Sequence, residues 1–169
     1  EEYKNRMSAK KLIYYRPDNT DFVYSAGDLI QFFSRNKVEQ IVLINPDNPS
    51  GNFIPKSDLI SLLDWAKDRN IVVILDESFV DFSTEGYQNS LLDNRVLEQY
   101  PQLMVIKSIS KSYGVPGLRL GIAASSNADV MRAIRSRLSI WNINSFAEFY
   151  LQIFGKYEKD YHRACNDFK

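Results

Sequence analysis

Four short apolar segments divide the chain into blocks. They span residues 40–44, 71–75, 103–106 and 118–124, and each is soon followed by polar or turn-forming residues. Apolar runs of this length predict β-strands, and the first two are typical of strands that are covered on both faces. A further short strand is predicted over residues 11–15, where Pro17 and Asp18 end it.

Between these segments the apolar residues recur at helical spacing. Residues 28–35 carry such a stripe, and another helix is predicted to begin at Pro55 and to be closed by Asn70. Further helices are predicted over residues 91–99, 128–138 and 145–168, the last capped by Ser145, and residues 1–9 read as the end of a helix. The buried side of the helix at Pro55 is predicted to hold Leu59, Ile60, Leu62, Leu63 and Ala66.

Strands that alternate with helices predict parallel βαβ units with helices on both faces of the sheet. We therefore predict an α/β fold of three layers, αβα, with a mostly parallel sheet. Residues 118–124 follow a loop too short for a crossover helix, so this strand is expected to run antiparallel. Ligands of such sheets bind beyond the carboxyl ends of the strands. The segments NPDNPSG, DESF and SISK each follow a strand, so they are expected to meet at one edge.

The composition narrows the classes of function. The chain has 169 residues, enough for one domain, and its 21 basic and 21 acidic side chains give no bias toward nucleic acid or membrane surfaces. No apolar run approaches the roughly 18 residues of a membrane span. The single cysteine, Cys165, excludes an internal disulfide and favours a reducing, cytosolic location. Because His162 is the only histidine, a Cys/His zinc cluster is excluded as well.

Three charged residues at the predicted edge could bind a ligand or take part in catalysis, and each also has an ordinary structural interpretation. Asp76 could face a cationic ligand, or it could cap the turn after its strand. Lys111 is a candidate nucleophile and proton carrier, although most lysines are simply exposed. Arg119 could grip a phosphate through two guanidinium nitrogens, or it could form a surface ion pair.

Three segments, taken in order, resemble a known family. SISK at 108–111 followed by GLRLG at 117–121 matches S-x-S-K and G-x-R-x-G, NPDNPSG at 45–51 matches N-P-x-N-P-T/S-G, and DESF at 76–79 matches D-E-x-F. The chain is thus similar to the fold-type I pyridoxal-phosphate enzymes. It resembles in particular the class I and II aminotransferases of the histidinol-phosphate aminotransferase and threonine-phosphate decarboxylase branch.

The resemblance implies a role for each matched residue. Lys111 would form the Schiff base with pyridoxal phosphate and carry protons, and Asp76 would face the ring nitrogen, so both would be catalytic. Asn48 would hydrogen-bond the ring oxygen, while Ser108 and Arg119 would hold the phosphate. The implied reaction moves an amino group between an amino acid or amino-phosphate and a 2-oxo acid, and no metal is implied.

The sequence departs from the family pattern at two points. Phe79 stands where the family usually has a tyrosine that also donates to the ring oxygen, so Asn48 would carry that contact alone. Glu2 and Tyr3 match the end of the family's P-T-F-x-E-Y element, and the chain lacks the amino-terminal phosphate-binding segment and the carboxy-terminal small domain. Residues 1–169 are therefore expected to be the central portion of the large, cofactor-binding domain and to be inactive alone.

Two alternatives stay open. A pyridoxal-phosphate-dependent amino-acid-phosphate decarboxylase uses the same scaffold, and a non-catalytic scaffold or dimerisation module would keep the fold without the chemistry. The resemblance further implies a homodimer that acts on small molecules, while the composition predicts a cytoplasmic location and no binding to nucleic acid or membranes.

Overall fold

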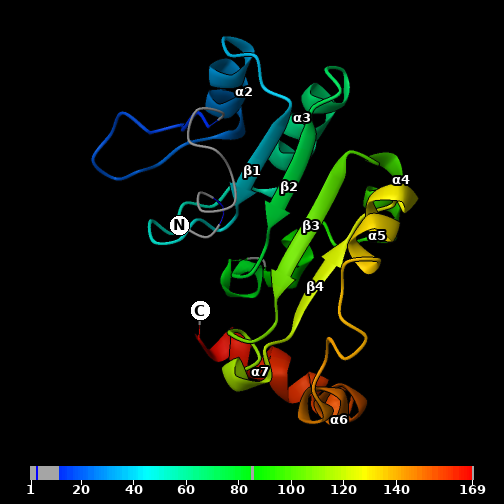
Figure 1. The fold of residues 1–169 in the computed structure, drawn as a ribbon. Helices are drawn as coiled ribbons and strands as arrows, with labels where there is room; N and C mark the ends of the chain where they lie inside the picture. Colours follow the sequence, from blue (N-terminus) through cyan, green and yellow to red (C-terminus); the bar gives the residue numbers. More distant parts are fainter. Residues whose placement is uncertain (1–2, 4–11, 85, 169) are drawn as a thin grey trace.

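A four-stranded sheet in the order β1-β2-β3-β4 forms the centre of the molecule. The computed structural model describes residue 3, residues 12–84 and residues 86–168. Strands β1, β2 and β3 are parallel, and β4 is antiparallel to β3. The predicted α/β class, with a mostly parallel sheet, one antiparallel strand and flanking helices, is confirmed (Figure 1). The strands span Gln40–Ile44 (β1), Val72–Asp76 (β2), Leu103–Ser108 (β3) and Gly121–Ala124 (β4).

The connection from β3 to β4 explains the reversal of direction. Residues 109–120 hold only the 3-10 helix η4, Pro116–Leu118, and no crossover helix. Arg119 then adopts a left-handed conformation with φ of 58°, so β4 begins at Gly121 rather than at residue 118. A Cβ atom at Gly121 would lie 3.3 Å from the Lys107 carbonyl oxygen, and glycine therefore allows the two strands to pair closely.

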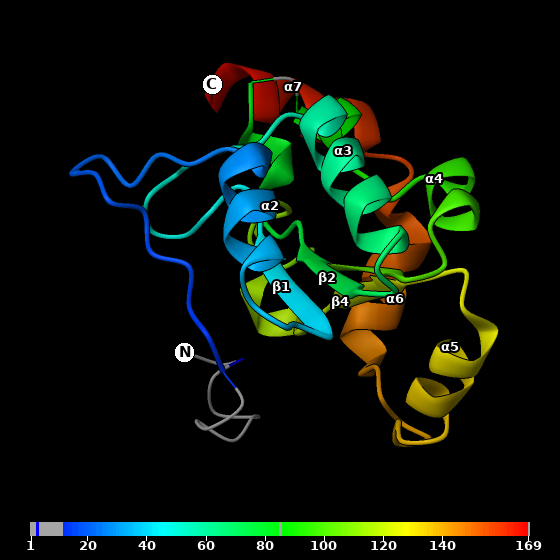
Figure 2. The ribbon, with the colours of Figure 1, turned by 90° about the horizontal axis from the view of Figure 1, so that it is seen from above.

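Helices α2 (Ala26–Ser34) and α3 (Lys56–Lys67) lie side by side over one face of the sheet (Figure 2). Helix α2 begins with a capping box between Ser25 and Asp28. Helix α3 starts one residue later than predicted because Pro55 is its N-cap, and Asn70, with φ of 55°, ends the turn that follows it. The core between these helices and the sheet includes Leu29, Ile41, Leu43, Leu59, Leu62, Leu63, Ala66, Val73, Leu75, Leu103 and Val105.

The opposite face of the sheet is less covered than the sequence suggested. Burial alternates along β1 and β2 instead of being continuous. On the less covered face Val72 is 43% exposed. The continuous burial expected of β1 and β2 is therefore found only on the face that α2 and α3 cover, while residues on the other face are partly buried or exposed.

The segment after β2 is irregular and is followed by a short helix. It contains the 3-10 helices η2 (Val80–Phe82) and η3 (Gly86–Asn89), and then α4 (Asn94–Gln99), whose N-cap is Asp93. The predicted helix over residues 91–99 is thus present but starts later. Its beginning is fixed by the Asp93 side chain, which accepts a hydrogen bond from the backbone N–H of Arg95.

The carboxy-terminal part forms three helices: α5 (Ala128–Arg135), α6 (Ser145–Phe154) and α7 (Glu158–Phe168). The single helix predicted over residues 145–168 is wrong, because the chain breaks at residues 155–157. The cap of α6 is Asn144, whose side chain accepts a hydrogen bond from Ala147 N, and not Ser145. Helices α6 and α7 lie beyond the carboxyl ends of the parallel strands (Figure 1).

Two further expectations concern the beginning of the chain. Residues 12–15 form no strand, although Tyr15 packs edge-on against Tyr24 and Phe32. Apart from Tyr3, the helix expected over residues 1–9 lies outside the described residues.

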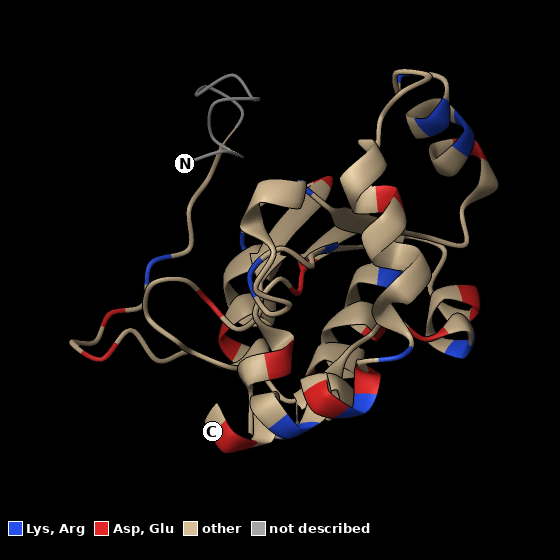
Figure 3. Cartoon of the chain, turned by 90° about the horizontal axis from the view of Figure 1, so that it is seen from below, with Lys and Arg blue, Asp and Glu red and all other residues tan. Residues whose placement is uncertain are grey.

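The charged surface carries both signs. Figure 3 shows basic residues gathered on α5, where Arg132 and Arg135 lie, and mixed charges on α7. Among the described residues no helix combines the length and apolar character needed to cross a membrane.

Candidate active site

The carboxyl ends of β1, β2 and β3 meet at one edge of the sheet, here called the carboxyl edge. In the register of the sheet Ile44 pairs with Asp76, and Asp76 pairs with Ile106. Backbone hydrogen bonds continue past the strand ends, from Asn45 N to Asp76 O (2.9 Å) and from Glu77 N to Ile106 O (2.8 Å). The segments NPDNPSG, DESF and SISK therefore leave the sheet side by side, as the topology predicted.

Asp76 ends β2 and is held through both of its carboxylate oxygens. Oδ1 accepts hydrogen bonds from the Ser78 backbone N–H (3.0 Å) and from the Ser78 hydroxyl (2.6 Å). Oδ2 accepts a hydrogen bond from the Tyr3 hydroxyl at 2.8 Å. Burial, and then the hydrogen bond to Asp76, raise the pKa of Tyr3 well above its ordinary value. Asp76 thus does cap its own turn, and the same contacts fix the orientation of its carboxylate.

Lys111 lies past the end of β3, with its side chain exposed. Its ammonium nitrogen is 4.2 Å from the centroid of the Phe79 ring, in cation–π geometry. The loop around it is closed by backbone hydrogen bonds from Gly114 N to Lys111 O (3.1 Å) and from Val115 N to Ser110 O (2.9 Å). The residue that replaces the expected tyrosine therefore supplies an aromatic face beneath the lysine.

Asn48 lies in the exposed turn after β1 and lines an open cavity of about 360 Å³. Phe79 lines the same cavity, together with Phe53 and Phe82. The turn is anchored by Asn45, whose side chain donates to Ile54 O (2.9 Å) and accepts from Ile54 N (2.8 Å). Because Phe79 contacts Lys111 and also lines this cavity, Asn48 and Lys111 belong to the same region of the carboxyl edge.

Ser108 and Arg119 lie at the same end of the β3–β4 hairpin. Ser108, the last residue of β3, pairs with Gly121, the first residue of β4, and Arg119 lies two residues before that glycine. Arg119 is exposed, and its guanidinium reaches the Pro116 carbonyl at 3.5 Å. Within the described residues no carboxylate pairs with it, so the surface ion pair considered for Arg119 finds no support.

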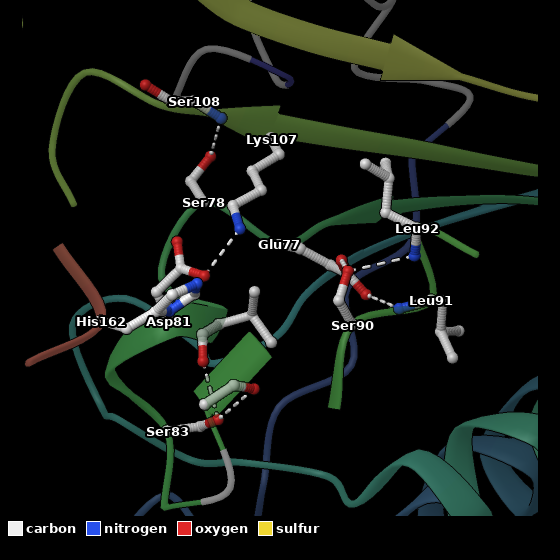
Figure 4. A network of polar contacts seen from close by, with 12 residues as sticks. Glu77, Ser78, Asp81, Ser83, Ser90, Leu91, Leu92, Lys107, Ser108 and His162 are labelled. Atoms are coloured by element: carbon white, nitrogen blue, oxygen red, sulfur yellow. Dashed lines mark hydrogen bonds and ion pairs between the residues drawn. The ribbon is translucent and has the colours of Figure 1, made fainter. Parts of the chain in front are cut away.

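The structure also contains a buried ion pair that the sequence analysis missed. Lys107 Nζ lies 2.7 Å from Asp81 Oδ1, and the two side chains are 9% and 4% exposed (Figure 4). The sequence did contain a signal for this ion pair, because Lys107 continues the inward-facing positions of β3 after Leu103 and Val105. A charged residue in such a position requires a buried partner.

Glu77, next to Asp76, points away from this pair and is 1% exposed. Its carboxylate accepts hydrogen bonds from the Ser90 hydroxyl (2.6 Å) and from Leu91 N (2.6 Å) (Figure 4). Burial raises the pKa of Glu77, although these hydrogen bonds act in the opposite direction. Glu77 therefore anchors the segment after η3 to the sheet.

The carboxyl edge gathers polar side chains of several chemical types. It combines an amine, a fixed carboxylate, an amide, a hydroxyl and a guanidinium, each from a different position along the chain. In the part of the chain that the structure describes, no group of three or more His, Cys, Asp or Glu side chains could hold a metal ion.

Comparison with known proteins gives these residues a family context. Residues 6–152 match the family "Aminotransferase class I and II". The chain is 33% identical over 168 residues to CMP-5'-(3-aminopropyl)phosphonate synthase of Streptomyces rubellomurinus. This match covers 99% of this chain and 26% of that protein. The chain is also 31% identical over 147 residues to the histidinol-phosphate aminotransferase of Clostridium novyi. That match covers 87% of this chain and 38% of that protein.

A solved structure agrees with the sequence matches. A decarboxylase from Sulfurospirillum multivorans superposes with a TM-score of 0.75 and 29% identity, over 92% of this chain and 44% of that chain. The chain therefore spans well under half the length of the relatives that it matches. The match over residues 6–152 shows that the chain belongs to the class I and II aminotransferase family.

Proposed function

We propose that the chain is the central, cofactor-binding portion of a pyridoxal-phosphate-dependent aminotransferase, with the phosphate-binding segment and the small domain supplied by further parts of a longer protein. The observation that carries the proposal is the setting of Lys111. Its exposed amine lies over Phe79, beside the cavity that Asn48 lines, at the edge where Asp76 ends β2. The short length relative to the family members supports the view that other segments complete the site.

The proposed roles follow from the chemistry of each side chain. When bound, pyridoxal phosphate supplies a ring that withdraws electrons from the substrate α-carbon. Asp76 holds a negative charge beside the ring nitrogen, and Asn48 donates a hydrogen bond to the ring oxygen. Ser108 and Arg119 hold the phosphate, the latter through its exposed guanidinium. Lys111 holds the cofactor through its side-chain amine and, once released, moves a proton at the α-carbon.

The substrate proposed is a small amine that also carries a phosphate or phosphonate, with a 2-oxo acid as its partner. The names of two relatives support this class, because an aminopropyl phosphonate and histidinol phosphate both combine an amine with a phosphorus oxyanion. As in the family resemblance, the proposed enzyme is a cytoplasmic homodimer.

A decarboxylase on the same fold is the second candidate, and the superposition on the Sulfurospirillum decarboxylase favours it. The two reactions differ in the bond broken at the substrate α-carbon. Residues that grip the substrate decide between them, and none of the candidates in this chain has that role. A third candidate is a non-catalytic scaffold or dimerisation module. The amine, carboxylate, amide, hydroxyl and guanidinium retained at the carboxyl edge argue against this candidate.

The test uses the full-length protein incubated with pyridoxal phosphate, reduced with borohydride and mapped by mass spectrometry. We expect the label on Lys111 and not on Lys107, since Lys107 is buried in an ion pair whereas Lys111 is exposed. The variant Lys111→Ala should lose the label. A label on another lysine would overturn the site, and no label at all would favour the non-catalytic module.

Product analysis then separates the two enzymes. Amino transfer that depends on an added 2-oxo acid supports the aminotransferase. Release of carbon dioxide without such dependence supports the decarboxylase.

A further inference from the structure

Ser78 occupies a bridging position between β2 and β3. Its side chain is buried, with 7% of the residue exposed. The hydroxyl donates to Asp76 Oδ1 at 2.6 Å and accepts from the Ser108 backbone N–H at 2.9 Å. Figure 4 shows the contact between Ser78 and Ser108, where β3 passes into the segment that carries Lys111.

The direction of both hydrogen bonds is fixed by chemistry. A backbone N–H can only donate, so the Ser78 oxygen accepts from Ser108 and its single proton is directed to Asp76. Rotation of the hydroxyl would leave a buried donor or acceptor without a partner, which is costly. The hydroxyl therefore links the carboxylate to the start of the lysine segment in one defined arrangement.

The contacts of Asp76 also limit what else it can bind. Two donors from Ser78 and one from Tyr3 reach its oxygens. A carboxylate offers about four acceptor positions, so roughly one stays available to a further donor. This count suits one ring N–H and leaves little freedom for the carboxylate to turn away.

We infer that Ser78 is a positioning residue that holds the Asp76 carboxylate toward the ring nitrogen of pyridoxal phosphate and keeps it in register with the Lys111 segment. The inference rests on the proposed function, because it presupposes that the cofactor binds at the carboxyl edge. In this role the buried Ser78 hydroxyl acts through Asp76 and does not contact the substrate directly.

Ser90 provides a matched control within the same chain. Its hydroxyl also donates to a carboxylate, Glu77 Oε2 at 2.6 Å, and accepts from a backbone N–H, that of Leu92 at 3.0 Å (Figure 4). The two serines thus make the same pair of hydrogen bonds, but Glu77 is not part of the proposed cofactor site. If removal of such a hydroxyl only lowers the stability of the fold, replacing Ser78 and replacing Ser90 should have the same effect.

The experiment compares full-length wild type, Ser78→Ala and Ser90→Ala, each loaded with pyridoxal phosphate labelled with ¹⁵N in its ring. We expect Ser78→Ala to move the ¹⁵N resonance toward the unprotonated position. It should also weaken cofactor affinity roughly tenfold, as for the loss of one hydrogen bond to a charged group. Ser90→Ala should lower the urea midpoint comparably and leave the ¹⁵N resonance and the affinity unchanged. If Ser78→Ala does not fold, Ser78→Cys keeps the volume with a weaker donor and should shift the resonance in the same direction.

Failure of this inference and failure of the proposed function are distinguishable. If wild type is trapped on Lys111 but the resonance and affinity of the Ser78 variants equal those of Ser90→Ala, the positioning role is overturned and the proposed function stands. If no lysine of wild type is labelled after borohydride reduction, the proposed function falls, and the role of Ser78 falls with it.

Discussion

Replacing Lys107 with methionine is expected to destabilise the fold strongly, although Lys107 has no proposed contact with a ligand. Its ammonium lies 2.7 Å from Oδ1 of the buried Asp81 carboxylate, and Oδ2 of that carboxylate has no hydrogen-bond partner among the described residues. Lys107→Met would thus leave a charge that is 4% exposed without its ion-pair partner. Removing one member of a buried pair typically costs about 3–5 kcal/mol. At about 2–4 °C per kcal/mol for a chain of this size, the melting temperature should fall by roughly 6–20 °C.

The assay is urea unfolding followed by circular dichroism, with a double variant and a surface control. Lys107→Met with Asp81→Leu removes both charges, and its cost should be much smaller than that of the single variant, since an apolar pair can replace a buried ion pair. Arg132→Met breaks an ion pair of similar length, 2.9 Å, whose side chains are 75% and 87% exposed, and should cost less than about 1 kcal/mol. A cost for Lys107→Met as small as that of Arg132→Met, or a double variant as unstable as the sum of both changes, would refute the reasoning.

Two further predictions follow from local contacts. Burial, and then the hydrogen bond to Asp64, raise the pKa of Tyr100 to about 12. The folded state favours the neutral phenol, so this contribution to stability is fully present below about pH 10 and is lost as pH rises toward about 12. Tyr100→Phe removes the ionisable group, so the urea midpoint of the variant should fall less than that of wild type over this pH range. Asn144→Ala should cost about 1 kcal/mol through loss of the α6 cap, whereas Ser145→Ala should cost less than about 0.5 kcal/mol. Equal costs at both positions in urea unfolding would contradict the assignment of the cap.

The sheet, and the meeting of the three candidate segments at one edge of it, could be predicted because both depend on periodicity and topology. Continuous apolar segments placed β1 within its true bounds and β2 within one residue of them, and parallel connections dictated that their carboxyl ends meet. The break between α6 and α7 was not predicted, since the aromatic stripe continues from Phe154 at the end of α6 through Tyr157 in the break to Tyr161 in α7. Residues 12–15 have the composition of a strand but pair with no neighbouring strand in the structure.

Within the site, the identity of the candidate residues was readable from the sequence, but their contacts were not. Asp76 was expected either to face a ligand or to cap a turn, and the structure shows that its contacts with Ser78 and Tyr3 occupy both oxygens. Phe79 was noted only for the hydroxyl that it lacks, whereas its ring lies beneath Lys111. Such contacts depend on strand register and side-chain direction, which hydrophobic patterning does not specify.

The less covered face of the sheet affects how this chain behaves when it is produced by itself. Val72 presents apolar surface to water on this face, while β1 and β4 each have one side without a neighbouring strand among the described residues. A bare apolar face bordered by free backbone donors and acceptors favours stacking and edge-to-edge addition of copies. Produced in isolation, the chain should become turbid as its concentration increases. A charged substitution at Val72, at the opposite end of β2 from Asp76, should delay that onset without disturbing the carboxyl edge.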